Sequence, residues 1–452
     1  MTFLWAEQAL LENGWADAVA IRLNGERIAE ITVGAAPQGQ RVGVLLPAPT
    51  NLHSHAFQRA MAGLTERRGP DPRDSFWTWR QLMYRFLDKL TPDDVQAIAA
   101  FVQMEMAQAG YAAVAEFHYL HHGPGGVPYA NPAEMAERVT AAAAQTGLGL
   151  TLLPVLYEFG GCDGRVLGPG QNRFGTTPDS FASLMQAAEA ALGHLPRDTV
   201  LGVAPHSLRA VSSAGLAFAA GLRPKAPIHM HLAEQKAEVD EVLAHRGARP
   251  TEWLLANVDV DARWCLIHCT QMLPHETKGL AATKAVAGLC PITESSLGDG
   301  IFDGVSYANH GGRWGVGSDS NIRIALAEEL RTLDYSQRLR DRSRAALATA
   351  DKSTGRVLFQ AAAMGGAQAA GRDAGAIGIG KLADLLALDT TGPDMAGHRG
   401  DTTLDAYIFA GDDRMVTDLW SAGRHLVSGG RHYAAPEITA SYFATVTKLR
   451  AL

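Results

Sequence analysis

The sequence predicts an α/β fold, a (β/α)8 TIM-like barrel with a small β-sandwich domain built from both ends of the chain. Eight short apolar runs each end abruptly in polar residues, and Ala-rich segments of helical period lie between them. Eight strand-helix repeats in one chain indicate such a barrel, whose active site lies at the carboxyl ends of the strands. The runs are 42–46, 112–115, 150–156, 200–204, 228–232, 264–267, 285–290 and 314–316.

Helix starts are marked independently of the apolar pattern. A capping residue followed by proline opens three of the Ala-rich segments. Because both residue types favour the first turn of a helix, we expect helices over 91–109, 131–145 and 177–192. The long connection 56–90 is predicted to form a lid over the barrel mouth, because its aromatic content argues against disorder. Those aromatic residues are Phe76, Trp77, Trp79, Tyr84 and Phe86.

The ends of the chain have a different pattern from the middle. Short alternating segments surround an Asn24-Gly25 turn, a strong hairpin signal. From about residue 378 the pattern again becomes short strands with Gly-rich turns. We therefore predict a small β-domain from residues 1–46 and 378–452, including a terminal helix, and a barrel domain over 47–377.

Composition excludes several classes of partner. The 452 residues are 47% hydrophobic and carry a formal net charge of −7 without a dense Lys/Arg cluster, which predicts neither nucleic-acid nor anionic-membrane binding. Four cysteines form no CxxC pair, and the start of the chain lacks a basic leader. These features favour a cytoplasmic protein, and a homodimer is the expected assembly.

Four residues are predicted to bind one metal ion. His53 and His55 are two apart, so in a strand both imidazoles face one side. His231 and Asp319 also follow apolar runs, and together the four offer three nitrogens and one carboxylate, which suits Zn²⁺ first and Fe²⁺ or Mn²⁺ as alternatives. The fourth strand ends at His206 without the lysine that would bridge two ions. One ion is therefore expected.

This metal set predicts hydrolysis. A bound ion lowers the pKa of a coordinated water from about 15.7 to about 7, which supplies a nucleophile at neutral pH. Glu234, three residues after His231, can carry a proton to the departing atom. His268 can orient the nucleophile or polarise the electrophile, and Asp319 can accept the proton of the water. The predicted reaction class is metal-assisted hydrolysis of a C–N bond.

The motifs around these residues resemble the amidohydrolase superfamily in its mononuclear deaminase branch, over nearly the whole chain. Segment 378–385 is similar to that superfamily's return into its small β-domain. Segments 51–63 and 205–209 further resemble the formimidoylglutamate deiminase family. This resemblance implies hydrolysis of N-formimino-L-glutamate to N-formyl-L-glutamate and ammonia, a step of histidine degradation.

Such a dicarboxylate substrate requires cationic partners. Arginine binds carboxylates through its planar fork, and we expect Arg80 and Arg209 to fill this role. The resemblance implies that Gln58, Tyr119 and His206 add hydrogen bonds to the substrate. Ser296 stands where relatives frequently carry Asn, which affects the polar contacts of its loop. The cluster His118, His121 and His122 precedes a Gly-Pro-Gly-Gly segment and is expected to be solvated.

Three alternatives remain open at the level of the sequence. The same scaffold could deaminate an aromatic base such as guanine or cytosine, although two arginines favour a dianionic aliphatic substrate. Formimino-aspartate differs from formimino-glutamate by one methylene, a weak basis for discrimination. A barrel that only binds a ligand is the alternative without catalysis.

Overall fold

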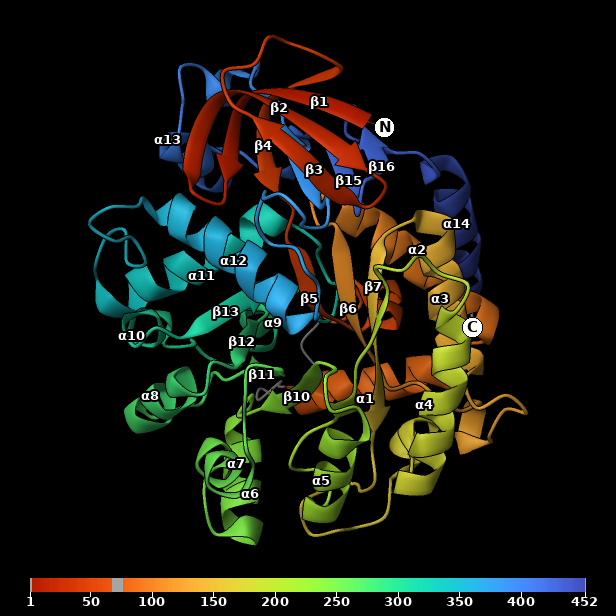
Figure 1. Cartoon of the computed structure of the whole chain (residues 1–452). Coiled ribbons are helices and arrows are strands. Elements are labelled where there is room, and N and C mark those ends of the chain that lie inside the picture. Colours follow the sequence, from red (N-terminus) through yellow and green to blue (C-terminus); the bar gives the residue numbers. More distant parts are fainter. Residues whose placement is uncertain (1, 67–75, 452) are drawn as a thin grey trace.

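The computed structural model describes residues 2–66 and 76–451 (Figure 1). Part of the predicted lid, residues 67–75, lies outside this range, as do the side chains of Phe76 and Trp77. The described parts of the lid segment form a short 3-10 helix, Ala56–Met61, and helix α1, Phe76–Leu87. No helix in the described ranges is long and apolar enough to cross a membrane.

The centre of the molecule is a closed parallel barrel, as predicted. Within the described residues, one sheet contains β5 to β8 in order, with β9 beside β7, and another contains β10 to β13. Parallel bridges between Val203 and Ile228 and between Ser54 and Asp319 join the two sheets. The strands are β5 (Thr50–Ser54), β6 (Ala113–His118), β7 (Gly149–Leu156), β8 (Val200–Leu201), β9 (Ala204–Pro205), β10 (Ile228–Leu232), β11 (Trp264–His268), β12 (Val286–Leu289) and β13 (Arg313–Val316).

The first strand of the barrel differs from the prediction. Run 42–46 belongs to β4, Gln40–Pro47, which pairs with β1 and β14 of another sheet. The barrel instead begins at β5, whose five residues are all buried although most are polar. Hydrophobicity alone misses such a strand, because its polar side chains face other polar groups inside the barrel.

Helices cover the outside of the barrel (Figure 1). Thr91 and Thr177 cap α2 and α4 as predicted, each through a side-chain bond to the backbone. The third predicted start is wrong by a few residues: α3 begins at Glu134, and Asn131 instead accepts a bond from the Ala133 N–H at 3.0 Å. The main helices are α2 (Pro92–Gln108), α3 (Glu134–Thr146), α4 (Pro178–Leu192), α5 (Ser213–Leu222), α6 (Lys236–Arg246), α7 (Pro250–Asn257), α8 (Pro274–Ala282), α9 (Pro291–Leu297), α10 (Gly304–Asn309), α11 (Leu326–Asp341), α12 (Thr354–Ala369), α13 (Asp401–Asp405) and α14 (Ala435–Arg450).

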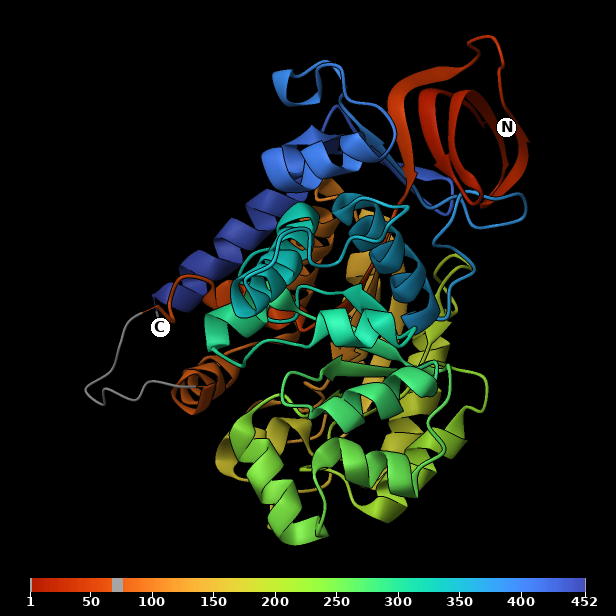
Figure 2. The ribbon, with the colours of Figure 1, turned by 90° about the vertical axis from the view of Figure 1, so that its left-hand side faces the viewer.

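Both ends of the chain contribute to one further sheet. In the described part of the chain this sheet has eight strands in the order β17-β16-β15-β14-β4-β1-β2-β3, and it lies at one end of the molecule (Figure 2). The expected hairpin is present, with Asn24 paired to Arg27. The sandwich form and the domain boundaries stay predictions. The strands are β1 (Thr2–Leu11), β2 (Gly14–Asn24), β3 (Arg27–Thr32), β4 (Gln40–Pro47), β14 (Leu385–Leu388), β15 (Val416–Ser421), β16 (Arg424–Ser428) and β17 (Arg431–His432).

A buried charge network joins this sheet to the amino ends of the barrel strands. Arg372, which follows α12, contacts Asp384 before β14 at 2.9 Å and Asp198 before β8 at 3.0 Å. Arg424 of β16 also contacts Asp198, at 2.8 Å. The side chains of Arg372 and both aspartates are at most 1% exposed. Every charge in this network has an opposite partner, which is the condition under which burial is tolerated.

Candidate active site

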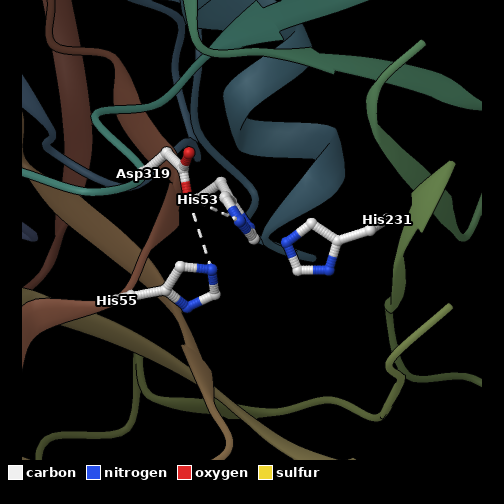
Figure 3. A group of neighbouring side chains, drawn as sticks. All are labelled: His53, His55, His231 and Asp319. Atoms are coloured by element: carbon white, nitrogen blue, oxygen red, sulfur yellow. Dashed lines mark ion pairs between the residues drawn. The ribbon is translucent and has the colours of Figure 1, made fainter. Parts of the chain in front are cut away.

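The four predicted metal ligands converge at the carboxyl ends of the strands (Figure 3). His53 is in β5, His55 follows that strand, His231 is in β10 and Asp319 follows β13. One ligand atom from each lies within 4.8 Å of the others. Both His53 Nε2 and His55 Nε2 are 3.3 Å from Asp319 Oδ1. Such spacing allows all four groups to contact one ion.

The donors of this group suit a divalent metal ion. Burial lowers the pKa of His53 to about 3, so its imidazole is neutral at physiological pH, as a metal ligand must be. Neither ring nitrogen of His53 has a regular hydrogen-bond partner among the described residues. His55 Nδ1 lies 3.0 Å from the Phe117 carbonyl and His231 Nδ1 lies 3.2 Å from the His206 carbonyl. Such bonds orient ligating histidines and leave their Nε2 atoms for the ion.

Backbone strain accompanies this site. Ala233, His268, Cys269 and Asp319 have φ of 52°, 71°, 54° and 44°, a region that residues other than glycine rarely adopt. All four lie at or just beyond the carboxyl ends of barrel strands. Hydrogen bonds hold the last of them in place, since Asp319 N–H donates to His53 O and its carbonyl accepts from His55 N–H, both at 2.9 Å. Strain of this kind clusters at functional sites.

The two predicted proton-handling side chains face each other. His268 Nε2 lies 3.7 Å from Glu234 Oε1. Burial raises the pKa of Glu234 above the ordinary carboxyl value, against the opposing effects of His268 and Arg209. Burial alone would lower the pKa of His268, but the carboxylates of Glu234, Glu294 and Asp319 raise it to about 10. The arrangement thus pairs a carboxyl group of raised pKa with an imidazole that keeps its proton.

All the predicted substrate-binding residues line one cavity with these groups. Tyr119 and His206 follow barrel strands, Arg80 comes from α1, and Gln58 comes from the 3-10 helix after β5. The lining includes Gln58, Arg80, Tyr119, His206 and Arg209 together with His55, His231, Glu234, His268 and Asp319. A substrate in this cavity would contact residues from both the barrel and the predicted lid.

Arg209 is a buried charge in the cavity without direct hydrogen bonds to the described residues. The residue is only 8% exposed, and its Nε has no hydrogen-bond partner in the described part of the chain. The carboxylates of Glu234 and Glu238 are 3.7 Å and 3.9 Å away, beyond hydrogen-bonding distance. A buried guanidinium without direct hydrogen bonds is costly unless a ligand completes its shell.

Two other lining residues are held in place by hydrogen bonds to neighbouring side chains. Gln58 Nε2 donates to Tyr119 Oη at 2.8 Å, whereas Gln58 Oε1 has no partner among the described residues. His206 Nδ1 lies 2.9 Å from Ser207 Oγ, so its orientation is set by a neighbour. Both residues can therefore take part in ligand binding without losing their own supports.

Sequence reasoning missed two residues of the site and misplaced others. Tyr157 lines the cavity directly after β7, where the strand-end rule could have identified it. Glu294 Oε1 lies 3.2 Å from His268 Nδ1, and no sequence signal marks this pairing. His118 and His121 were predicted to be solvated, which is wrong, because they are 5% and 2% exposed. The loop packs inward there, and His121 Nε2 lies 3.0 Å from the Val155 carbonyl.

The fold and the site together define a metal-dependent hydrolase of the TIM-like barrel class. A model described as the amidohydrolase family matches residues 44–426. A second model, described as formimidoylglutamate deiminase HutF, N-terminal domain, matches residues 1–41. The chain belongs to the amidohydrolase family.

Three similar proteins illustrate this membership. The formimidoylglutamate deiminase of Pseudomonas aeruginosa is 48% identical over 455 residues, covering 99% of each chain. The crystal structure of an amidohydrolase from Brucella melitensis has a TM-score of 0.95 and 46% identity, covering 99% of this chain and 100% of that one. The 5-methylthioadenosine/S-adenosylhomocysteine deaminase of Natronomonas pharaonis is 26% identical, covering 92% of this chain and 87% of its own.

Proposed function

We propose that this protein hydrolyses N-formimino-L-glutamate to N-formyl-L-glutamate and ammonia, a deimination in histidine degradation. Its similarity to the deiminase of Pseudomonas aeruginosa over 99% of both chains supports this activity. The observation that carries it furthest is Arg209, a buried cation that lacks direct hydrogen bonds among the described residues, beside the proton-handling pair. A substrate carboxylate would supply the missing acceptors through a bidentate contact.

The metal in this proposal is one divalent ion held by His53, His55, His231 and Asp319. Three nitrogens and one carboxylate match Zn²⁺, and Fe²⁺ or Mn²⁺ accept the same donors. When bound, such an ion supplies a water nucleophile at neutral pH by lowering the pKa of that water to about 7. The neutral state of the buried His53 supports this ligand set.

The side chains of the site would then distribute the protons of the reaction. Asp319 accepts a proton from the attacking water, and oxygen adds to the formimino carbon. His268, 3.2 Å from Glu294 through Nδ1, directs its Nε2 proton towards the negative charge on the oxygen that adds to that carbon. Glu234 delivers one proton to the imino nitrogen as oxygen adds, and then relays to the same nitrogen the remaining hydroxyl proton of the intermediate, so that ammonia leaves when the C–N bond breaks. The proton held by Asp319 then returns to Glu234. A carboxyl group with a raised pKa suits this delivery.

Substrate binding would use the polar groups of the cavity wall. Arg209 and Arg80 bind the two carboxylates of the substrate. Gln58 Oε1 accepts a hydrogen bond from the formimino N–H, and Tyr119, to which Gln58 is bonded at 2.8 Å, supports it. His206 adds a further hydrogen bond. Supports of this kind hold binding groups in a fixed geometry before the substrate arrives.

A deaminase of an aromatic base is the second candidate, favoured by the 26% identity to the deaminase of Natronomonas pharaonis. A flat neutral ring would offer the guanidinium of Arg209 no carboxylate at hydrogen-bonding distance, and this buried cation would keep only its longer contacts with Glu234 and Glu238. A dicarboxylate therefore fits the described cavity better. Choice between formimino-glutamate and formimino-aspartate, the homodimer and the cytoplasmic location stay predictions.

The proposal is tested by ammonia release from the metal-loaded enzyme. N-formimino-L-glutamate should be turned over faster than N-formimino-L-aspartate, 5-methylthioadenosine, guanine or cytosine. Glu234→Gln should lower kcat by about 10²- to 10⁴-fold, the usual contribution of general acid–base catalysis, with unchanged metal content. Glu30→Gln, in an exposed ion pair with Arg22, is the control and should remain fully active.

Two results would contradict the proposal. Turnover of an aromatic base without turnover of either formimino acid would favour the second candidate. A metal-free protein that binds these compounds without turning them over would support a barrel that only binds a ligand.

A further inference from the structure

A buried carboxylate outside the cavity holds the turn that carries Glu234. Glu238 is the third residue of α6, is 0% exposed and does not line the cavity. Its Oε1 accepts the Ala233 N–H at 3.1 Å, and its Oε2 accepts the Glu234 N–H at 3.0 Å. Both oxygens of one side chain are therefore bonded to the backbone of the turn between β10 and α6.

This bonding differs from the ordinary capping of a helix. A glutamate at the third position of a helix normally accepts the N–H of the residue just before the first turn, as Glu276 of α8 does from Leu273. The corresponding residue of α6 is Gln235, and Glu238 reaches past it to the two residues before. Its carboxylate thus contacts the segment that connects the strand to the helix.

The turn needs such support because its backbone is strained. Ala233 has φ of 52°, in the left-handed region that is unfavourable for residues other than glycine. Its carbonyl accepts the Gln271 N–H at 2.9 Å, and the Glu234 carbonyl accepts the Thr270 hydroxyl at 2.7 Å. The turn is therefore held through its N–H groups by Glu238 and through its carbonyls by the segment after β11.

The direction of the Glu234 side chain depends on this turn. Glu234 is 4% exposed, and its Oε1 lies 3.7 Å from His268 Nε2. Strand β10 pairs with β11 as far as Leu232, so the sheet fixes His231 but ends before Glu234. Beyond the strand, the bonds to Glu238 and to the segment after β11 set the backbone conformation at Glu234.

We propose that Glu238 is a positioning residue, which holds the turn of Ala233 and Glu234 so that the Glu234 carboxyl group reaches the imino nitrogen of the substrate. This inference rests on the proposed function, in which Glu234 delivers protons to that nitrogen. Glu238 itself touches no reacting atom. Two buried N–H groups without acceptors are costly, so loss of the Glu238 carboxylate should let the turn move and should displace Glu234 with it.

The test compares Glu238→Gln with the wild-type, metal-loaded enzyme on N-formimino-L-glutamate. Glutamine has a similar size but offers one acceptor oxygen instead of two, and its NH2 group would face the second N–H. The variant should lose about 10- to 100-fold in kcat, as expected for a hydrogen bond to a charged group, with KM and metal content unchanged. Glu238 Oε2 is also 3.9 Å from Arg209 Nε. A change in KM alone would indicate an effect through that arginine and would contradict the proposal.

A double-mutant cycle with Glu234→Gln isolates the positioning role. Glu238→Gln should lower kcat in the wild-type background and have no further effect in the Glu234→Gln background, because no carboxyl group then remains to be positioned. An effect on the structure of the whole site would instead lower kcat by the same factor in both backgrounds.

Relief of the strain at Ala233 gives an independent test. Glycine adopts positive φ readily, so Ala233→Gly should raise the kcat of Glu238→Gln by about 10-fold. No such recovery is expected if Glu238 acts only through its negative charge, because glycine does not restore that charge.

A matched variant controls for the loss of a buried carboxylate. Glu276 occupies the same position in α8, is 2% exposed and lies 3.1 Å from Arg249 Nε, but it does not line the cavity. Glu276→Gln should lower the melting temperature and leave kcat and KM at wild-type values.

The possible failures are distinguishable. If the wild type does not hydrolyse N-formimino-L-glutamate, or if Glu234→Gln remains fully active, the proposed function or its proton transfers fail and this inference fails with them. If the wild type is active and Glu234→Gln is impaired, three results overturn only the role of Glu238. These results are a full kcat for Glu238→Gln, an equal loss in both backgrounds, and no recovery with Ala233→Gly.

A folding defect of Glu238→Gln would also be informative. In that case the double variant of Ala233→Gly and Glu238→Gln decides the question. A folded double variant with kcat within about 10-fold of the wild type would support the proposal. A double variant that is less active or does not fold would overturn it, since Glu238 would then serve the fold as a whole.

Discussion

The two ends of the barrel bury charge in opposite ways. At the amino ends of the strands, Arg372 contacts Asp198 and Asp384 within 3.0 Å. At the carboxyl ends, His53 and Arg209 are also buried, yet buried polar nitrogens of both lack hydrogen-bond partners among the described residues. Buried polar groups are normally satisfied. The contrast separates an end that maintains the fold from an end prepared for a ligand, as in other barrels of this type.

The largest effect should come from removing a proposed metal ligand at the carboxyl ends of the barrel strands. His231→Ala removes one of the four donors, and kcat/KM should fall by at least about 10⁴-fold, since a bound ion contributes several kcal/mol to catalysis. Metal analysis of the purified variant should show that the ion is lost. A variant that keeps both its metal and its turnover would contradict the ligand assignment.

The matched control lies in the same strand. His229 of β10 is also buried and faces the same side of the strand as His231, but it lies nearer the amino end of the strand, and its Nε2 is 2.7 Å from the Ala369 carbonyl of α12. His229→Ala should therefore lower the melting temperature while metal content and kcat remain at wild-type values. Within one strand, His229 is thus expected to contribute to stability and His231 to metal binding.

Breaking the charge network at the amino ends of the barrel strands should lower stability and leave catalysis unchanged. Arg372→Met leaves Asp198 and Asp384 buried with fewer partners, and the free energy of unfolding should fall by about 3–5 kcal/mol. Denaturant titration measures this loss, while kcat of the folded enzyme should stay unchanged. Arg27→Met is the control, because its pair with Asp373 is exposed and worth about 0–1 kcal/mol. An unchanged unfolding midpoint for Arg372→Met would contradict the claim that this charge network stabilises the fold.

The smallest effect should be a dependence of the free energy of unfolding on pH, caused by Asp198 at the amino ends of the barrel strands. Burial acts to raise the pKa of Asp198, but Arg424 and Arg372 bring it below its ordinary value. Ionised Asp198 therefore stabilises the fold above the unfolded value of about 3.9, and this contribution is lost as the pH falls through the folded value. Asp198→Asn should remove this acid-dependent part in unfolding curves from pH 7 to pH 3. Asp93→Asn, an exposed site on α2, should follow the wild type.

Most of the barrel was predictable because its strands are apolar and its helices have capped starts. Runs such as 228–232 and 264–267 coincide with β10 and β11. The first strand was not, since Val42 to Leu46 is more apolar than Thr50 to Ser54 and yet enters the other sheet. Which sheet a short run joins depends on partners far away in the chain, and this information is absent from local hydrophobicity.

The candidate site was predictable where strand ends carry the residues. The four proposed ligands, Glu234 and His268 all lie at or near such ends, so the barrel geometry brings them together. Glu294 was not predictable, because its place in the site depends on a hydrogen bond between α9 and the end of β11. The burial of His118 and His121 likewise follows from how a loop folds back, which the Gly-Pro-Gly-Gly segment did not indicate.

The bridge between Ser54 and Asp319 closes the ring of strands, and the ligand group spans that closure, with His53 on one side and Asp319 on the other. An ion there connects the first and last parts of the barrel segment, so a chain still being synthesised cannot capture it with the full ligand set. Since an ion that binds only the native state stabilises that state by mass action, cellular supply of the metal would govern how long each finished molecule survives proteolysis.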